Sequence, residues 1–166
     1  MDLPASKKTE LGLYLTAIEA YDFIKAHEQE VLFIDVRTRA EVTFIGMPTL
    51  VDANIPYKDE SNWQNWDEKG KTYELVVNND FVTAVNQRLQ EKALTKQSPV
   101  ILMCRSGIRS AEATNVLSKA GYTTVYNLVD GFEGDSNAKG QRVVNGWKNS
   151  QLPWSFDLDK QKMYWR

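Results

Sequence analysis

The sequence predicts an α/β fold in which a central parallel sheet carries helices on both faces. Three short segments are predicted to be buried strands, because they are apolar and rich in β-branched residues: 31–36, 99–103 and 123–128. Helical patterns of apolar residues lie between them, at about 79–93 and after residue 107. This alternation of strands and helices is typical of a parallel sheet.

A helix is predicted soon after the start of the chain. Thr16 and Glu19 have the spacing of a capping box, in which each side chain bonds to the backbone N–H of the other residue. Apolar residues then recur at helical spacing as far as Ile24. We interpret residues 1–13 as an N-terminal extension and residues 14–148 as the main domain.

The strand at 31–36 leads into a short charged segment. Arg37 and Glu41 lie four residues apart, a spacing that places two side chains on the same face of a helix. We expect these two side chains to pair if the segment is helical. A further strand is predicted near residues 51–55.

Residues 57–78 mix charge with aromatic side chains and follow neither the strand nor the helix pattern. We interpret this segment as an insertion that runs over the surface. Loops of this length are uncommon in compact domains unless they serve a purpose. Trp63 and Trp66 are expected to pack the insertion onto the domain. The alternative is that one of them forms a wall or lid over Cys104.

The stretch Cys104-Arg105-Ser106-Gly107-Ile108-Arg109-Ser110 lies between the strand at 99–103 and a helix that Gly121 ends. In open α/β sheets, ligands bind beyond the carboxyl ends of the strands. The free N–H groups at a helix start favour an anion there. The apolar residues that predict this helix recur at positions i, i+3, i+4 and i+7: Ala113, Val116, Leu117 and Ala120.

These residue types indicate anion and thiol chemistry. A helix N-terminus and neighbouring cations stabilise a thiolate, which is the nucleophilic form of cysteine, so we expect Cys104 to hold much thiolate at neutral pH. Arg105 and Arg109 are permanent cations whose fork of donors suits sulfonate, phosphate or carboxylate oxygens. Gly107 lets the loop bend through conformations that are closed to other residues. The alternative is that Cys104 is an ordinary buried thiol.

The 104–110 stretch resembles the active loop of the single-domain members of the rhodanese, or sulfurtransferase, family. The resemblance covers residues 14 to 148, although Met47 stands where the family usually has His. It implies a rhodanese-like three-layer fold. The other matching segments are Asp35-Val36-Arg37 with Glu41, Gly46-Met47-Pro48 through Ala53-Asn54-Ile55-Pro56, and Tyr126-Asn127-Leu128 with Asp130-Gly131-Phe132.

The resemblance also implies a reaction. Cys104 would take a sulfane sulfur from a donor such as thiosulfate, carry it as a persulfide and pass it to a thiophilic acceptor, without metal or organic cofactor. The N–H groups of residues 105–110 would hold the terminal sulfur, and Arg105 and Arg109 would hold the donor sulfonate. The remaining implied roles are hydroxyl hydrogen bonds from Ser106 and Ser110, a lining role for Gly107 and Ile108 in the same loop, and structural roles near the site for Asp35 and Arg37.

A rival class also uses a cysteine in an anion-binding loop at a helix N-terminus, namely cysteine-dependent phosphatases and arsenate reductases. Their loop places an arginine six positions after the cysteine. Here that position is Ser110, and the last arginine is Arg109. The shorter loop suits a sulfur atom better than a tetrahedral oxyanion, so the sequence favours sulfur transfer.

A second alternative is a persulfide carrier or protein-interaction module that turns over thiosulfate poorly. Residues 131–146 are polar, carry glycines and are predicted to be loop. The segment 149–166 is rich in aromatic residues, so we expect it to pack on the domain. A partner-binding surface there is the alternative.

Composition limits the remaining function classes. The chain has 20 Lys and Arg against 22 Asp and Glu, a net charge of −2, so no general field attracts nucleic acid or an acidic membrane. No apolar run is long enough to span a bilayer. A single cysteine excludes an internal disulfide and a cysteine-rich zinc site. We expect a cytoplasmic protein, or a periplasmic one if a signal peptide was removed, whose partners are small sulfur-containing anions and a thiol or protein acceptor.

Overall fold

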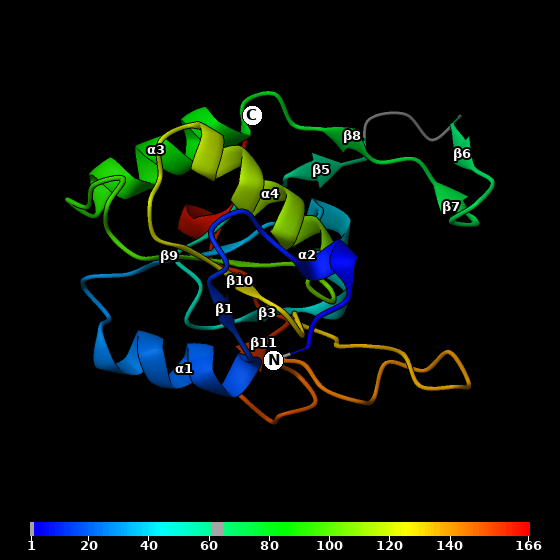
Figure 1. Cartoon of the computed structure of the whole chain (residues 1–166). Helices are drawn as coiled ribbons and strands as arrows, with labels where there is room; N and C mark the ends of the chain where they lie inside the picture. The colour runs from blue at the N-terminus through cyan, green and yellow to red at the C-terminus, as the bar shows by residue number, and fades with distance from the viewer. Residues whose placement is uncertain (1, 61–64) are drawn as a thin grey trace.

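The computed structural model describes residues 2–60 and 65–166, and its centre is a five-stranded parallel sheet (Figure 1). The strand order is β1-β10-β9-β2-β4. Every neighbouring pair is parallel, which confirms the predicted α/β fold. The strands are β1 (Tyr14–Leu15), β2 (Leu32–Asp35), β4 (Ala53–Asn54), β9 (Val100–Met103) and β10 (Val125–Leu128).

Helices cover both faces of this sheet and complete three layers (Figure 1). On one face, α3 (Phe81–Glu91) and α4 (Ile108–Lys119) pack on side chains that include Leu102 of β9. On the other face, α1 (Ala17–Ala26) and α2 (Arg39–Ile45) pack on a cluster that includes Ile101. All four residues of β9 are buried, which explains why this strand is an unbroken apolar run in the sequence.

Two capping boxes fix the starts of α1 and α2. Thr16 and Glu19 form the predicted box at α1, where the Thr16 N–H donates to Glu19 Oε2 at 2.8 Å. Thr38 and Glu41 form a second box at α2, where the Thr38 N–H donates to Glu41 Oε2 at 3.0 Å. The second box orients the Glu41 carboxylate toward the carboxyl end of the sheet, where Cys104 lies.

The 57–78 insertion projects from the domain as two short antiparallel ladders (Figure 1). Trp66 packs edge-on against Tyr73, 5.4 Å between ring centroids, and is 48% exposed. The expectation that Trp66 packs the insertion onto the domain is therefore wrong, because its ring partner lies within its own hairpin; Trp63 lies outside the described residues. The ladders pair β5 (Lys58–Asp59) with β8 (Val76–Val77), and β6 (Trp66–Asp67) with β7 (Thr72–Tyr73).

The C-terminal region returns to the domain. Strand β11 (Trp154–Ser155) pairs antiparallel with β3 (Met47–Pro48), next to the end of α2. Trp147 is fully buried, and its indole N–H donates to the Pro153 carbonyl at 2.9 Å. Two short 3-10 helices lie near the chain ends, at Ala5–Lys7 and Lys160–Lys162.

No helix in residues 2–60 or 65–166 has both the length and the apolar character that crossing a membrane requires.

Candidate active site

Cys104 follows β9 directly, at the carboxyl edge of the sheet, and the residue is only 1% exposed. The backbone then turns at Gly107, which has a φ of +92° and caps the start of α4. This turn aims the Gly107 N–H at the cysteine, with a nitrogen to Sγ distance of 3.1 Å. A side chain at position 107 would overlap the Val129 carbonyl, so glycine is required both for the left-handed conformation and for the close packing.

The second group at the sulfur is the Ser110 hydroxyl. Its oxygen lies 3.3 Å from Cys104 Sγ and 2.6 Å from Asn127 Oδ1. A hydroxyl has one proton, so Ser110 donates either to the sulfur or to the amide oxygen. Donation to the sulfur stabilises a thiolate or a persulfide anion, and donation to Asn127 leaves an acceptor facing a protonated thiol.

Asn127 holds the loop from below and was not among the residues that the sequence singled out for the site. It is fully buried on β10, and its Nδ2 donates to the Gly107 carbonyl at 3.0 Å and to the Lys7 carbonyl at 3.1 Å. A buried amide that uses both of its N–H donors in this way specifies one arrangement of the groups around it. Asn127 therefore fixes the turn that presents the Gly107 N–H.

The loop is also bound to the segment that follows β10. The Phe132 N–H donates to the Cys104 carbonyl at 2.8 Å, and the Glu133 N–H donates to the Arg105 carbonyl at 3.0 Å. Gly131 packs so closely on the Arg105–Ser106 peptide that a Cβ there would overlap it. These contacts make the 131–134 segment a wall of the active loop.

Asp35 and Arg37 form a fully buried ion pair behind the site, with 2.6 Å between Arg37 Nη2 and Asp35 Oδ2. The same nitrogen donates to the Gly46 carbonyl at 2.7 Å, and the guanidinium lies 4.1 Å from the centre of the Phe132 ring. The predicted pair between Arg37 and Glu41 is therefore wrong. The Arg37 side chain turns back to the strand end instead of following the helix face.

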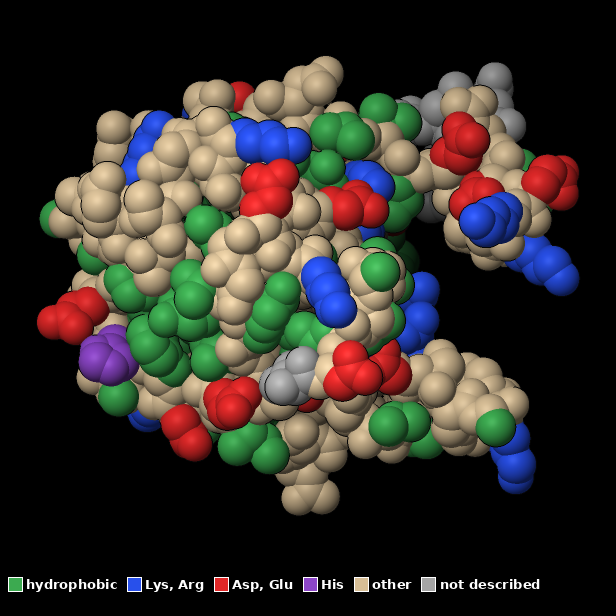
Figure 2. Space-filling view, in the orientation of Figure 1, with side chains coloured by type: hydrophobic (Ala, Val, Ile, Leu, Met, Phe, Trp, Pro, Cys, Tyr) green, Lys and Arg blue, Asp and Glu red, His purple; other side chains and the backbone are tan. Residues whose placement is uncertain are grey.

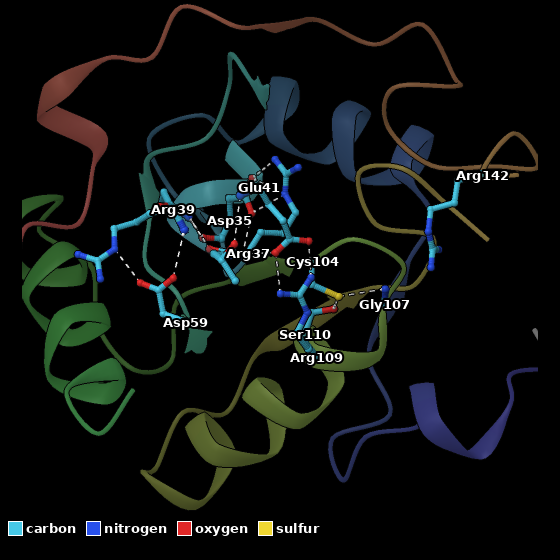
Figure 3. A network of polar contacts seen from close by, with 12 residues as sticks. Asp35, Arg37, Arg39, Glu41, Asp59, Cys104, Gly107, Arg109, Ser110 and Arg142 are labelled. Atoms are coloured by element: carbon cyan, nitrogen blue, oxygen red, sulfur yellow. Dashed lines mark hydrogen bonds and ion pairs between the residues drawn. The ribbon is translucent and has the colours of Figure 1, made fainter. Parts of the chain in front are cut away.

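Glu41 pairs with Arg109 of the active loop, across 68 residues of sequence (Figure 3). The contact is bidentate, with distances of 2.7 Å and 2.6 Å, and both side chains are about 15% exposed. Burial alone would raise the pKa of the Glu41 carboxyl, but the hydrogen bonds and the charge of Arg109 outweigh it and lower the pKa to about 2. Burial alone would lower the pKa of Arg109, and the Glu41 carboxylate more than reverses this and raises it.

A cavity of about 390 Å³ opens above Cys104. Its floor is the active loop, through Cys104, Arg105, Ser106, Ile108 and Arg109, with Thr38 and Glu41 beside it. The Gly107 N–H and the Ser110 hydroxyl reach the sulfur from the buried side of the loop.

The cavity walls come from two projections, the insertion and the loop 131–146. The insertion contributes Glu60, Thr72, Tyr73 and Leu75, and the loop contributes Arg142. Figure 2 shows the resulting hollow between the two projections, with basic side chains at its back. No sequence motif marks Arg142, because it is a single arginine in a polar loop.

Within the described residues, no group of three or more His, Cys, Asp or Glu side chains is arranged to hold a metal ion.

Comparison with known proteins agrees with this geometry. The model of the rhodanese-like domain matches residues 16–138. The crystal structure of Rv0390 from M. tuberculosis superposes with a TM-score of 0.67 at 30% identity, covering 86% of this chain and 96% of that one. An uncharacterized protein of Rickettsia conorii is 32% identical over 142 residues, which are 86% of this chain and 96% of the relative.

A shorter match is to the thiosulfate sulfurtransferase GlpE of Tolumonas auensis, which is 44% identical over 41 residues, 25% of this chain and 39% of that protein. The family model by contrast spans most of the chain, and it includes four of the five sheet strands (β2, β4, β9 and β10), the active loop and α4. The chain therefore belongs to the rhodanese-like domain family.

Proposed function

We propose that this chain is a sulfurtransferase that moves a sulfane sulfur from a small anionic donor, such as thiosulfate, to a thiophilic acceptor. The observation that carries the proposal is the placement of Cys104 Sγ. It lies at the floor of an arginine-lined cavity, 3.1 Å from the Gly107 nitrogen and 3.3 Å from the Ser110 oxygen. Donors aimed at a sulfur atom stabilise the anion that a thiolate or a persulfide carries.

The reaction consists of two displacements at sulfur. In the first, the Cys104 thiolate attacks the outer sulfur of thiosulfate, a bond forms between the two, and the donor S–S bond breaks with its electron pair leaving on sulfite. In the second, an acceptor such as cyanide or a thiol attacks the terminal sulfur of the persulfide. The Cys104 thiolate then leaves with the electron pair of the Sγ–S bond, so the cycle closes without a further reactant.

The rival phosphatase chemistry has weaker support. A phosphoryl-transfer loop needs a guanidinium that is free to embrace a tetrahedral oxyanion. Here the last arginine of the loop, Arg109, gives both terminal nitrogens to Glu41. The position beyond it is Ser110, which contacts the sulfur.

Intact mass tests the proposal directly, because the chain has one cysteine. After incubation with thiosulfate, the protein should gain one sulfur, roughly 32 Da, and cyanide should remove it with release of thiocyanate. Cys104→Ala should gain nothing while keeping the wild-type circular dichroism spectrum. Full transfer activity in Cys104→Ala would contradict the mechanism, and an arsenate- or phosphate-dependent adduct would move the chain to the rival class.

A persulfide carrier for a protein partner is the second candidate. Both projections beside the cavity expose apolar side chains, among them Trp66 at 48%, Val143 at 60% and Val144 at 58%. Solvent-exposed apolar groups around a site favour a protein surface as the acceptor. Rapid persulfide formation with slow discharge by cyanide would favour this carrier over a general enzyme.

A further inference from the structure

The charges around the cavity are divided unequally, and this division points to one side as the place where an anion binds. Arg109 is neutralised by the bidentate contact with Glu41. Arg105 and Arg142 line the same cavity, and within the described part of the chain neither forms an ion pair with a carboxylate. In Figure 3, Arg142 lies on the opposite side of Cys104 from the Glu41–Arg109 pair.

Arg142 is held in place despite being in a loop. Its Nη1 donates to the Gly134 carbonyl at 2.6 Å, and its own carbonyl accepts from Asn149 Nδ2 at 3.1 Å. A β-bridge to Ser136 closes the base of the loop. Because one terminal nitrogen is used for anchoring, Nε and Nη2 keep their donors for a ligand.

The base of the same loop is fixed to the N-terminal region. Lys7 Nζ pairs with Asp135 at 2.7 Å, and the Asp135 N–H donates to Asn145 Oδ1 at 2.7 Å. Because these contacts already order the loop that carries Arg142, a ligand does not have to order it on binding. The entropic cost of binding an anion at Arg142 is therefore lower.

Two cations that face one cavity repel each other until an anion enters between them. Burial lowers the pKa of Arg142, and the charge of Arg105 lowers it further, while Glu133, Asp135 and Cys104 act in the opposite direction. Asp135 is already paired with Lys7, and Glu133 forms no ion pair with Arg142. An incoming anion would therefore relieve the repulsion between Arg105 and Arg142.

We propose that Arg105 and Arg142 form the anion-binding pair of this site, and that Arg109 is a positioning residue that ties the active loop to Glu41. This anion-binding role rests on the proposed sulfur transfer, and it adds Arg142 as a residue that selects the donor. The pair would hold the sulfonate of the donor away from Glu41 and direct the sulfane sulfur at Cys104. The donor class is then a small sulfur compound whose anionic group lies next to its sulfane sulfur.

The test needs no sulfur transfer, because the single cysteine reports the charge beside it. Iodoacetate and iodoacetamide alkylate a thiol by the same displacement and differ in charge. We take the rate constant of iodoacetate divided by that of iodoacetamide on Cys104, and divide this ratio by the same ratio for a small free thiol. The result measures how strongly the cavity attracts an anion. Arg142→Gln should lower this normalised ratio roughly three- to tenfold, the effect of one unit charge several ångströms away in a partly hydrated cavity.

Three companion measurements sharpen the result. Arg142→Lys keeps the charge and should retain most of the wild-type ratio. Lys139→Gln removes the same charge from the same loop at an exposed position outside the cavity lining, and should leave the ratio unchanged. Added salt should shrink the wild-type preference, because it screens the pair.

An unchanged ratio in Arg142→Gln, or an equal drop in Lys139→Gln, would overturn the proposed pair. The two proposals fail separately. If the alkylation ratio falls in Arg142→Gln but the wild-type protein gains no sulfur from any donor, sulfur transfer is refuted and the anion-binding pair is supported. If the protein forms the persulfide but the alkylation ratio is unchanged in Arg142→Gln, the anion-binding pair is refuted and sulfur transfer is supported.

Discussion

Replacing Glu41 by Gln tests the contact that closes one side of the site. The substitution keeps the size of the side chain but removes the charge and one of the two acceptor oxygens that Arg109 uses. Both partners are largely shielded from water, with side-chain exposures of 16% for Arg109 and 15% for Glu41. The variant therefore leaves a mostly buried guanidinium without its counter-charge, which costs more than the loss of a surface pair.

The magnitude follows from the shifted pKa of Glu41. In the folded protein it is about 2, against an ordinary value of 4.5. A lowering of about 2.5 units corresponds to about 3 kcal/mol of folding stability at pH 7. Because the folded pKa is the lower one, this stability is present above pH 4.5 and is lost as the pH falls toward 2. At pH 3, roughly half of it would remain.

Urea unfolding followed by tryptophan fluorescence measures this stability at both pH values. At pH 7, Glu41→Gln should unfold with a free energy about 3 kcal/mol below wild type, and the gap should narrow to about half at pH 3. Glu91→Gln is the matched control, because Glu91 pairs with Arg88 on an exposed helix face, and it should cost under about 1 kcal/mol. A gap below about 1 kcal/mol at pH 7, or one that stays constant with pH, would refute this reasoning.

Two further substitutions probe the turn and the sulfur contact. Gly107→Ala should lower the free energy of unfolding by at least about 2 kcal/mol, because the added Cβ meets the Val129 carbonyl. Gly12→Ala is the control, since Gly12 is left-handed but has open space around it, and it should cost about 1 kcal/mol. Equal losses of stability in thermal unfolding would contradict this. Ser110→Ala removes the hydroxyl 3.3 Å from Cys104 Sγ, and it should slow iodoacetamide alkylation at pH 6 about tenfold if the hydroxyl stabilises the thiolate. An unchanged rate would show that the hydroxyl bonds only to its other neighbour.

The sequence predicts four of the five sheet strands and the place of the active loop, for physical reasons, but it predicts no strand at the two-residue edge strand β1. Strands buried on both faces are typically apolar runs; β9 is apolar throughout, and β2 is apolar up to Asp35 at its end. The loop carries its own local signals, namely a cysteine after a strand, a glycine at the turn and a helix behind it. These signals are contiguous in the chain, so no tertiary information is needed to find them.

The pairing of charges around the loop could not be predicted in the same way. The partner of Arg109 is 68 residues away, and the helix capping that orients Glu41 depends on where α2 begins. Arg142 reaches the cavity only because its loop is anchored to another part of the chain. The ladders of the insertion are two residues long, which is too short for an alternating pattern to emerge.

The strand order has a consequence for how the protein is made. Within the described residues, strand β1 pairs with β10 alone, so β1 has no partner strand until more than a hundred further residues have been synthesised. At about 5–20 residues per second, that wait lasts on the order of ten seconds. Cys104 is synthesised before Asn127 and the 131–134 segment, so its thiol is exposed in the nascent chain before the residues that surround it are present. The Cys104 thiol is therefore more open to oxidants during synthesis than in the folded protein, where the residue is buried.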